Sequence, residues 1–193
     1  MHQQIILASQ SPRRKQLLEW ACQPFQILVV PTDESFPLEM RPDEAAIHIA
    51  RNKALAVINS SAYNSQFLEW PVLAADTIVV LDGNIIGKPR DRENALEILN
   101  ALSGREHQVI TGVVILQGEK EIAFHETTAV KFHALTEKEI AFYVDEYRPY
   151  DKAGAYAIQE WIGVVGIRSV NGDFYNVMGL PVSRVVRALQ QNL

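Results

Sequence analysis

Residues 72–81 have the sequence VLAADTIVVL, which is apolar throughout except for Asp76 and Thr77. A bounded apolar run that is rich in β-branched residues predicts a buried strand. Asp82-Gly83 follows at once and favours a hairpin turn into Ile85-Ile86. This stretch therefore predicts a core strand that carries one carboxylate in apolar surroundings.

Strands and helices are predicted to alternate on both sides of this run. The evidence is the spacing of apolar residues, together with capping residues, Pro and Gly at the ends of segments. The other predicted strands are residues 5–8, 25–30, 107–117, 121–133 and 164–170. The predicted helices are residues 12–21, 42–60, 92–102 and 137–147, and a terminal helix opened by Pro181. Asn171-Gly172 predicts a further hairpin turn.

This order of elements predicts an α/β fold with a mixed, twisted sheet flanked by helices. The length of 193 residues suits a single domain over residues 1–193, and an arrangement of two lobes around a central cleft also fits. The single cysteine, Cys22, excludes an intramolecular disulfide framework. With no secretory signal or membrane-spanning run predicted, we expect a soluble, cytoplasmic protein without a membrane partner.

The formal net charge of −5 argues against charge-driven adhesion to nucleic acid, so a polyanionic ligand must be met by local basic groups. Such groups occur in Ser9-Gln10-Ser11-Pro12-Arg13-Arg14, at a predicted strand end and helix start. Free amide hydrogens and a partial positive charge at a helix N-terminus attract phosphate, and two hydroxyls and two guanidiniums would extend that site. The alternative is a capped helix with solvated arginines.

Asp76 is the second candidate, because a lone carboxylate in an apolar strand is costly unless it is paired, hydrogen-bonded or bound to a metal. The alternative is a strand bulge or a solvated face. Glu34, in a polar loop, could complete an oxygen-ligand site for Mg²⁺ or Mn²⁺ with Asp76. Lys53 and Lys88, taken singly, are typical of surface charges. For His107 we expect a structural hydrogen bond rather than acid–base catalysis.

Together these segments resemble the Maf family of nucleotide pyrophosphatases, whose fold is similar to that of the inosine triphosphate pyrophosphatases. The resemblance extends over nearly the whole chain, in nine islands that keep the family's order. These are residues 7–14, 50–54, 75–79, 87–89, 102–104, 107–109, 111–112, 151–156 and 177–181.

The resemblance implies an enzyme that hydrolyses the α–β phosphoanhydride of dTTP, UTP and related pyrimidine nucleotides to a monophosphate and pyrophosphate, with Mg²⁺ or Mn²⁺. Asp76 matches the family's general base and would share the metal with Glu34, or with the adjacent Asp33. Phosphate contacts are implied for Ser9, Ser11, Arg13, Arg14, Lys53 and Lys88. The positions implied in base specificity are Arg13, Thr77 and Gln159. An amide such as Gln159 can both donate to and accept from a pyrimidine edge.

Two alternatives stay open beside this function. One is a 7-methyl-GTP pyrophosphatase of the same family, and the other is a non-catalytic nucleotide-binding or nucleic-acid-binding regulator of cell division. A homodimer is expected by analogy with relatives. The mechanism further requires that Asp76 face a groove with Arg13, Lys53 and Lys88 and not be locked in an internal ion pair.

Overall fold

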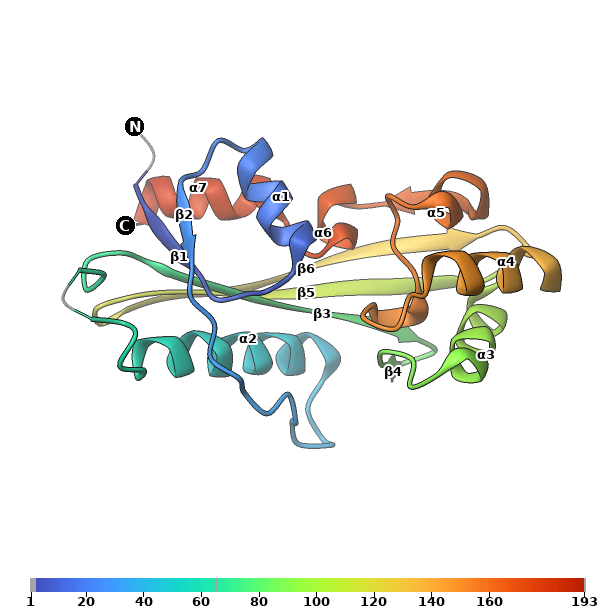
Figure 1. Cartoon of the computed structure of the whole chain (residues 1–193), viewed down its shortest axis with the longest axis horizontal. Helices are drawn as coiled ribbons and strands as arrows, with labels where there is room; N and C mark the ends of the chain where they lie inside the picture. Colours follow the sequence, from blue (N-terminus) through green and yellow to red (C-terminus); the bar gives the residue numbers. More distant parts are fainter. Residues whose placement is uncertain (1–2, 65, 193) are drawn as a thin grey trace. The chain divides into compact units, whose positions relative to one another are not determined.

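The computed structural model describes residues 3–64 and 66–192 and contains one mixed sheet with helices around it (Figure 1). The strands lie in the order β2 (Phe25–Ile27), β1 (Ile5–Leu7), β3 (Val72–Leu81), β5 (Glu106–Gln117), β6 (Lys120–Phe132) and β7 (Ile167–Asn171), and β4 (Asn84–Ile86) pairs with β3. Strands β1 and β2 are parallel, as are β1 and β3, whereas β3–β4 and β6–β7 are antiparallel. The predicted fold class, a mixed sheet flanked by helices, is therefore confirmed. The single domain with a central cleft stays a prediction.

The chain divides into two compact units. The first consists of the described parts of Met1–Thr77, Thr111–Glu126 and Gly179–Leu193, and the second consists of Ile78–Ile110 and Thr127–Met178. Three long strands contribute residues to both units. They are β3 (Val72–Leu81), β5 (Glu106–Gln117) and β6 (Lys120–Phe132).

The first unit places helices on both faces of its part of the sheet, as Figure 1 shows for α2 on one side and α1 and α7 on the other. Its own elements are β1 (Ile5–Leu7), α1 (Pro12–Trp20), β2 (Phe25–Ile27), α2 (Pro42–Ile58) and α7 (Val182–Asn192). The apolar side of α2 packs on the strands in a core that includes Ala50, Ala54, Val72, Ala74 and Val114. These small and β-branched residues bring helix and sheet into close contact.

Gly112 on β5 shows how close the contact is. A Cβ atom at this position would lie 2.3 Å from the carbonyl carbon of Ala46 and 2.4 Å from the nitrogen of Ile47, both in the backbone of α2. Only a residue without a side chain fits here, so the glycine sets the distance between α2 and β5.

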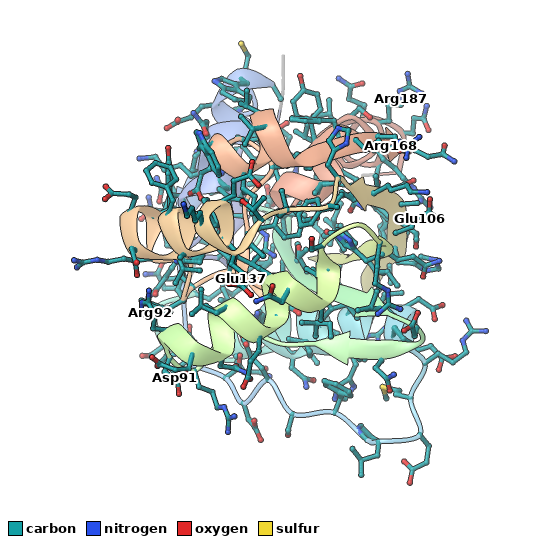
Figure 2. The ribbon with its side chains drawn as sticks, turned by 90° about the vertical axis from the view of Figure 1, so that its right-hand side faces the viewer. Asp91, Arg92, Glu106, Glu137, Arg168 and Arg187 are labelled. Atoms are coloured by element: carbon teal, nitrogen blue, oxygen red, sulfur yellow. The ribbon has the colours of Figure 1, made fainter. Side chains whose placement is uncertain are left out.

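The second unit is built from short elements around the remaining parts of the long strands. They are β4 (Asn84–Ile86), α3 (Arg92–Leu102), α4 (Glu137–Tyr147), η1 (Ala153–Ala155), α5 (Trp161–Gly166), β7 (Ile167–Asn171) and α6 (Phe174–Met178). Figure 2 labels Asp91 and Arg92 at the start of α3. Asp91 accepts the Asn94 amide hydrogen at the N-cap of α3, and Arg92 forms an ion pair with Asp145 of α4.

Two predictions in the second unit are wrong. The sequence predicts a strand over residues 164–170, but a helix runs to Gly166 and the strand begins only at Ile167. A short apolar run fits either period, and the helix that forms here requires a glycine at position 163, because any Cβ there would lie 1.7 Å from the Ile158 carbonyl oxygen. The predicted hairpin at Asn171-Gly172 is also absent, since Asp173 Oδ1 accepts amide hydrogens of the following turn and starts α6.

Elsewhere the predicted elements are confirmed with small shifts of their ends. Strand β2 is shorter than predicted and ends at Ile27, and α7 begins at Val182, one residue after Pro181. The capping box of Thr136 and Glu139 is present at the start of α4. In the described residues, no helix is long and apolar enough to cross a membrane.

Candidate active site

The segment from Ser9 to Arg14 leads from the end of β1 into α1, as predicted. Ser11 occupies the N-cap position and Pro12 the first turn, but the Ser11 hydroxyl makes no capping hydrogen bond. Instead, the Ser11 amide donates to Ser9 Oγ at 3.2 Å. Ser9 is buried and Arg13 is half-buried. The first turn of α1 therefore has a serine hydroxyl beside its amide hydrogens, a setting that suits an anion.

Arg14 is buried, with 8% of its surface exposed. Its Nε donates to the Gly179 carbonyl oxygen at 2.8 Å. Its Nη1 donates to Ser9 Oγ at 3.0 Å, and its Nη2 donates to Thr77 Oγ1 at 3.1 Å. Burial lowers the pKa of the guanidinium, while the negative charges of Asp76 and Glu34 oppose that effect. The two carboxylates thus lie within electrostatic reach of Arg14.

Thr77 connects Arg14 to the strands. Its Oγ1 lies 2.9 Å from Oγ1 of the fully buried Thr111 on β5, and it donates to the Gly179 carbonyl oxygen at 3.4 Å. Gly179 has φ +116°, in the region that favours glycine, and precedes the turn into α7. Three segments distant in sequence therefore meet at one guanidinium, and Thr77 connects β5 to them as a fourth.

Lys53 joins the two predicted acids. Its Nζ lies 2.6 Å from Asp76 Oδ1 and 2.7 Å from Glu34 Oε1. Asp76 is 8% exposed, so the alternative of a solvated strand face is excluded. The Lys53 and Asp76 side chains are only 16% and 12% exposed, whereas the Glu34 side chain on the same ammonium is 46% exposed. The mechanism requires that Asp76 not be locked in an internal ion pair, and the structure shows such a pair. Its partner, Lys53, is itself a predicted site residue.

The structure distinguishes Glu34 from its neighbour. Asp33 Oδ1 accepts the Ser35 amide hydrogen at 2.9 Å and its Oδ2 accepts the Ser35 hydroxyl at 2.7 Å. These bonds lower the pKa of Asp33 and hold its carboxylate within its own loop. Glu34, and not Asp33, shares an ammonium with Asp76.

The carboxylate pair fits a divalent cation bound together with a phosphate. One ammonium between two carboxylates leaves the three side chains with a net charge of −1 when all are ionised, 1 − 2. The described residues contain no group of three or more His, Cys, Asp or Glu side chains that could hold a metal by themselves. Mg²⁺ commonly takes one or two carboxylates and completes its shell with water and substrate phosphates, so two acids are sufficient.

Lys88 and Gln159 belong to the second unit. Lys88 lies between β4 and α3 with an exposed side chain. Gln159 is exposed on a turn in which the Glu160 amide donates to the Ala157 carbonyl oxygen. The buried Tyr143 hydroxyl accepts the Ala157 amide hydrogen at 3.1 Å and donates to the Glu160 carboxylate, so the turn is held at both ends.

Three participants in these networks were not singled out from the sequence. Thr111 and Gly179 lie in two of the islands that carry the family resemblance, but nothing in their spacing ties them to Arg14. Tyr143 sits on the buried face of a helix, where an aromatic residue is ordinarily part of the core. Only the fold brings each of them to its partner.

A family model described as Maf-like protein matches residues 4–192. A Bacteroides thetaiotaomicron protein named dTTP/UTP pyrophosphatase is 45% identical over 190 residues, covering 97% of this chain and 95% of the relative. A Bacillus cereus protein of the same name is 46% identical over 187 residues, covering 97% of this chain and 94% of the relative.

Among solved structures, the Staphylococcus aureus Ham1 protein aligns with 67% of this chain and 72% of its own, at 15% identity and a TM-score of 0.43. That likeness is too weak to bear on fold or function. The family match and the relatives, in contrast, span nearly the whole chain. The chain belongs to the Maf family.

Proposed function

We propose that this chain is a nucleoside triphosphate pyrophosphatase that hydrolyses dTTP and UTP to the monophosphate and pyrophosphate. The observation that carries the proposal is the meeting of Glu34, Lys53 and Asp76 at one ammonium, near the buried Arg14 and the start of α1. The choice of pyrimidine nucleotides is supported by relatives of 45% and 46% identity that bear the name dTTP/UTP pyrophosphatase.

The chemistry asked of these groups is the cleavage of one phosphoanhydride by water. The water oxygen bonds to the α-phosphorus, and the bond from that phosphorus to the α–β bridging oxygen breaks. Pyrophosphate leaves with the electron pair of that bond, and Asp76 accepts the proton from the water. No covalent enzyme intermediate is needed.

Charge explains the residue types around the reacting phosphorus. A triphosphate repels an attacking oxygen, and positive groups that meet its charge stabilise the transition state. The Ser9 hydroxyl, the first turn of α1 and Arg13 would hold phosphate oxygens, and we assign Ser11, Lys53 and Lys88 the same role. A divalent cation, Mg²⁺ or Mn²⁺, would be held by Glu34 and Asp76 and would neutralise charge on the phosphates when bound. For base selection we propose Arg13, Thr77 and Gln159.

The test is a substrate panel with purified protein. Initial rates of pyrophosphate release are measured for dTTP, UTP, 7-methyl-GTP and GTP with Mg²⁺, with Mn²⁺ and with a chelator. We expect dTTP and UTP to be turned over fastest, and the chelator to abolish the reaction. Preference for 7-methyl-GTP would overturn the base assignment. Absence of turnover with every nucleotide would refute the enzyme and favour the non-catalytic binding protein.

We also propose that the enzyme is a cytoplasmic homodimer that needs no nucleic-acid or membrane partner. The support is its family membership and the nucleotide substrate proposed for it. Size-exclusion chromatography with light scattering gives the mass directly, and a value near the 21.7 kDa of one chain would contradict the dimer.

A further inference from the structure

The role of Arg14 follows from its hydrogen bonds. A buried guanidinium requires acceptors for its N–H groups, because desolvation of an unpaired charge is costly. Arg14 donates to Ser9 Oγ, Thr77 Oγ1 and the Gly179 carbonyl oxygen, all of which are neutral. Three of its five N–H groups are thus directed at protein acceptors in three fixed directions, an arrangement that only the planar guanidinium fork provides.

The Ser9 hydroxyl is constrained by these contacts. A hydroxyl has two lone pairs that accept and one O–H that donates. Ser9 Oγ accepts from the Ser11 amide at 3.2 Å and from Arg14 Nη1 at 3.0 Å, so both lone pairs are used. What remains is the O–H group. Ser9 can therefore bind a further ligand only as a donor, and a phosphate oxygen accepts such a bond.

We propose that Arg14 is a positioning residue that fixes the Ser9 hydroxyl as a donor to a phosphate oxygen of the substrate and holds Ser9 against Thr77 and Gly179. This inference rests on the proposed function, because it takes a phosphate as the ligand. It replaces the direct phosphate contact implied by the resemblance with an effect that acts through Ser9.

The proposal is tested by separating the charge of Arg14 from its geometry. The variants are Ser9→Ala, Arg14→Lys, Arg14→Gln and the double variant Ser9→Ala with Arg14→Gln. Lys15→Gln is the matched control, since Lys15 lies on the same helix with a 51% exposed side chain. The measurements are kcat/KM for UTP and the Kd of its α,β-methylene analogue, with thermal unfolding midpoints to verify folding.

A positioning role predicts that the charge-conserving variant does not rescue the enzyme. Hydrogen bonds to charged groups contribute about 1.5–3 kcal/mol, so we expect Ser9→Ala and Arg14→Gln each to lower kcat/KM by roughly 10- to 100-fold. The kcat/KM of Arg14→Lys should fall as far as that of Arg14→Gln. When Arg14→Gln is already present, adding Ser9→Ala should lower kcat/KM by less than about twofold further, because the effects of residues that act through one another are not additive. Lys15→Gln should match the wild type.

Two results would overturn the proposal. One is an Arg14→Lys enzyme within about twofold of the wild type, because an ammonium cannot reproduce the three directed bonds of the guanidinium fork. The other is a double variant whose loss is the product of the two single losses. Both are read against a wild type that hydrolyses UTP, and a wild type without turnover would instead refute the proposed function.

A measurement on the wild type covers the case in which the Arg14 variants do not fold. A crystal structure with pyrophosphate or the α,β-methylene analogue should show a phosphate oxygen within hydrogen-bond distance of Ser9 Oγ. Arg14 should still contact Ser9, Thr77 and Gly179 there. An Arg14 that leaves these partners and binds the phosphate itself would contradict the positioning role.

Discussion

At the scale of single residues, the site depends on an imbalance of charge. Lys53 brings one positive charge to two carboxylates, so Glu34 and Asp76 together exceed their partner. A triphosphate bound beside them would add more negative charge. Under the proposed function, a divalent cation at the two acids would relieve this repulsion beside the positive charges of Lys53 and Arg14.

The metal-side acid can be tested with a pair of neighbouring variants. We expect Glu34→Gln to weaken Mn²⁺ binding by at least about tenfold, the lower range found even for residues outside the ligand shell. Asp33→Asn should leave the affinity unchanged, because that carboxylate is held by Ser35. Titration of Mn²⁺ by electron paramagnetic resonance measures both. A larger loss in Asp33→Asn than in Glu34→Gln would show that the metal had been assigned to the wrong acid.

The sequence pointed to Asp76 because the free-energy cost of burying a carboxylate in an apolar strand can be inferred from the sequence alone. The ion pairs of Lys53 with Asp76 and Glu34 could not be inferred in this way, because Lys53 lies on a helix and Glu34 in a loop, where single charged residues are common. Arg14 was predicted to face a phosphate, and its burial and its bonds to Thr77 and Gly179 could not be foreseen. Residue types were predictable here, and their contacts depended on the fold.

At the scale of elements, close packing of α2 on β5 leaves a specific weak point. Replacing Gly112 by Ala forces a Cβ into the backbone of Ala46 and Ile47, and overpacking of this kind costs about 1–3 kcal/mol or more. Gly87→Ala is the control, because a Cβ there meets nothing within 4 Å. Urea unfolding compares the two. Equal free energies of unfolding for Gly112→Ala and the wild type would show that α2 and β5 are not so closely packed.

On the second unit's part of β5, His107 makes stability depend on pH. It is 2% exposed, its Nε2 lies 2.8 Å from the Tyr156 hydroxyl, and burial lowers its pKa to about 4. The expected structural hydrogen bond is thus present. The unfolded chain takes up a proton near pH 6.5 and the folded chain only near 4. This contribution to stability is therefore complete above pH 6.5 and is lost as the pH falls toward 4.

The size of the loss follows from the two pKa values. Between about pH 7 and about pH 4.5 the free energy of unfolding should fall by about 2–3 kcal/mol through His107. A His107→Gln variant lacks this titration, so its unfolding free energy should change less over the same interval. Urea titrations of both proteins at the two pH values give the difference. Parallel pH profiles would mean that His107 titrates alike in the folded and unfolded chain.

Elements with strong local signals were mostly predictable; of the two that failed, one lacked such a signal and the other carried a misleading one. The run Val72–Leu81 and the capping box at Thr136 are defined by their own residues. The segment after Glu160 is not, because its helix needs a residue without a Cβ at position 163, beside the Ile158 carbonyl oxygen. Asn171-Gly172 carries a hairpin signal, and the Asp173 side chain directs the chain into α6 instead.

At the scale of the whole molecule, the topology of the sheet brings the residues of the site together. Parallel pairing of β1 with β3 brings the chain after Leu7 beside the strand that carries Asp76 and Thr77. Helix α2 adds Lys53, β5 adds Thr111, and the turn before α7 adds Gly179. An α/β fold could be predicted from the order of elements. Which strands become neighbours could not, because pairing is set between segments far apart in the chain.

The most direct test of the central claim, attack on the α-phosphorus with Asp76 as the base, is hydrolysis of UTP in ¹⁸O-labelled water. The products are followed by ³¹P nuclear magnetic resonance for the wild type and for Asp76→Asn. The account predicts that the label enters UMP, that pyrophosphate is unlabelled, and that Asp76→Asn folds normally but loses at least about 100-fold in rate. Label in pyrophosphate or orthophosphate, or an Asp76→Asn enzyme as fast as the wild type, would contradict it.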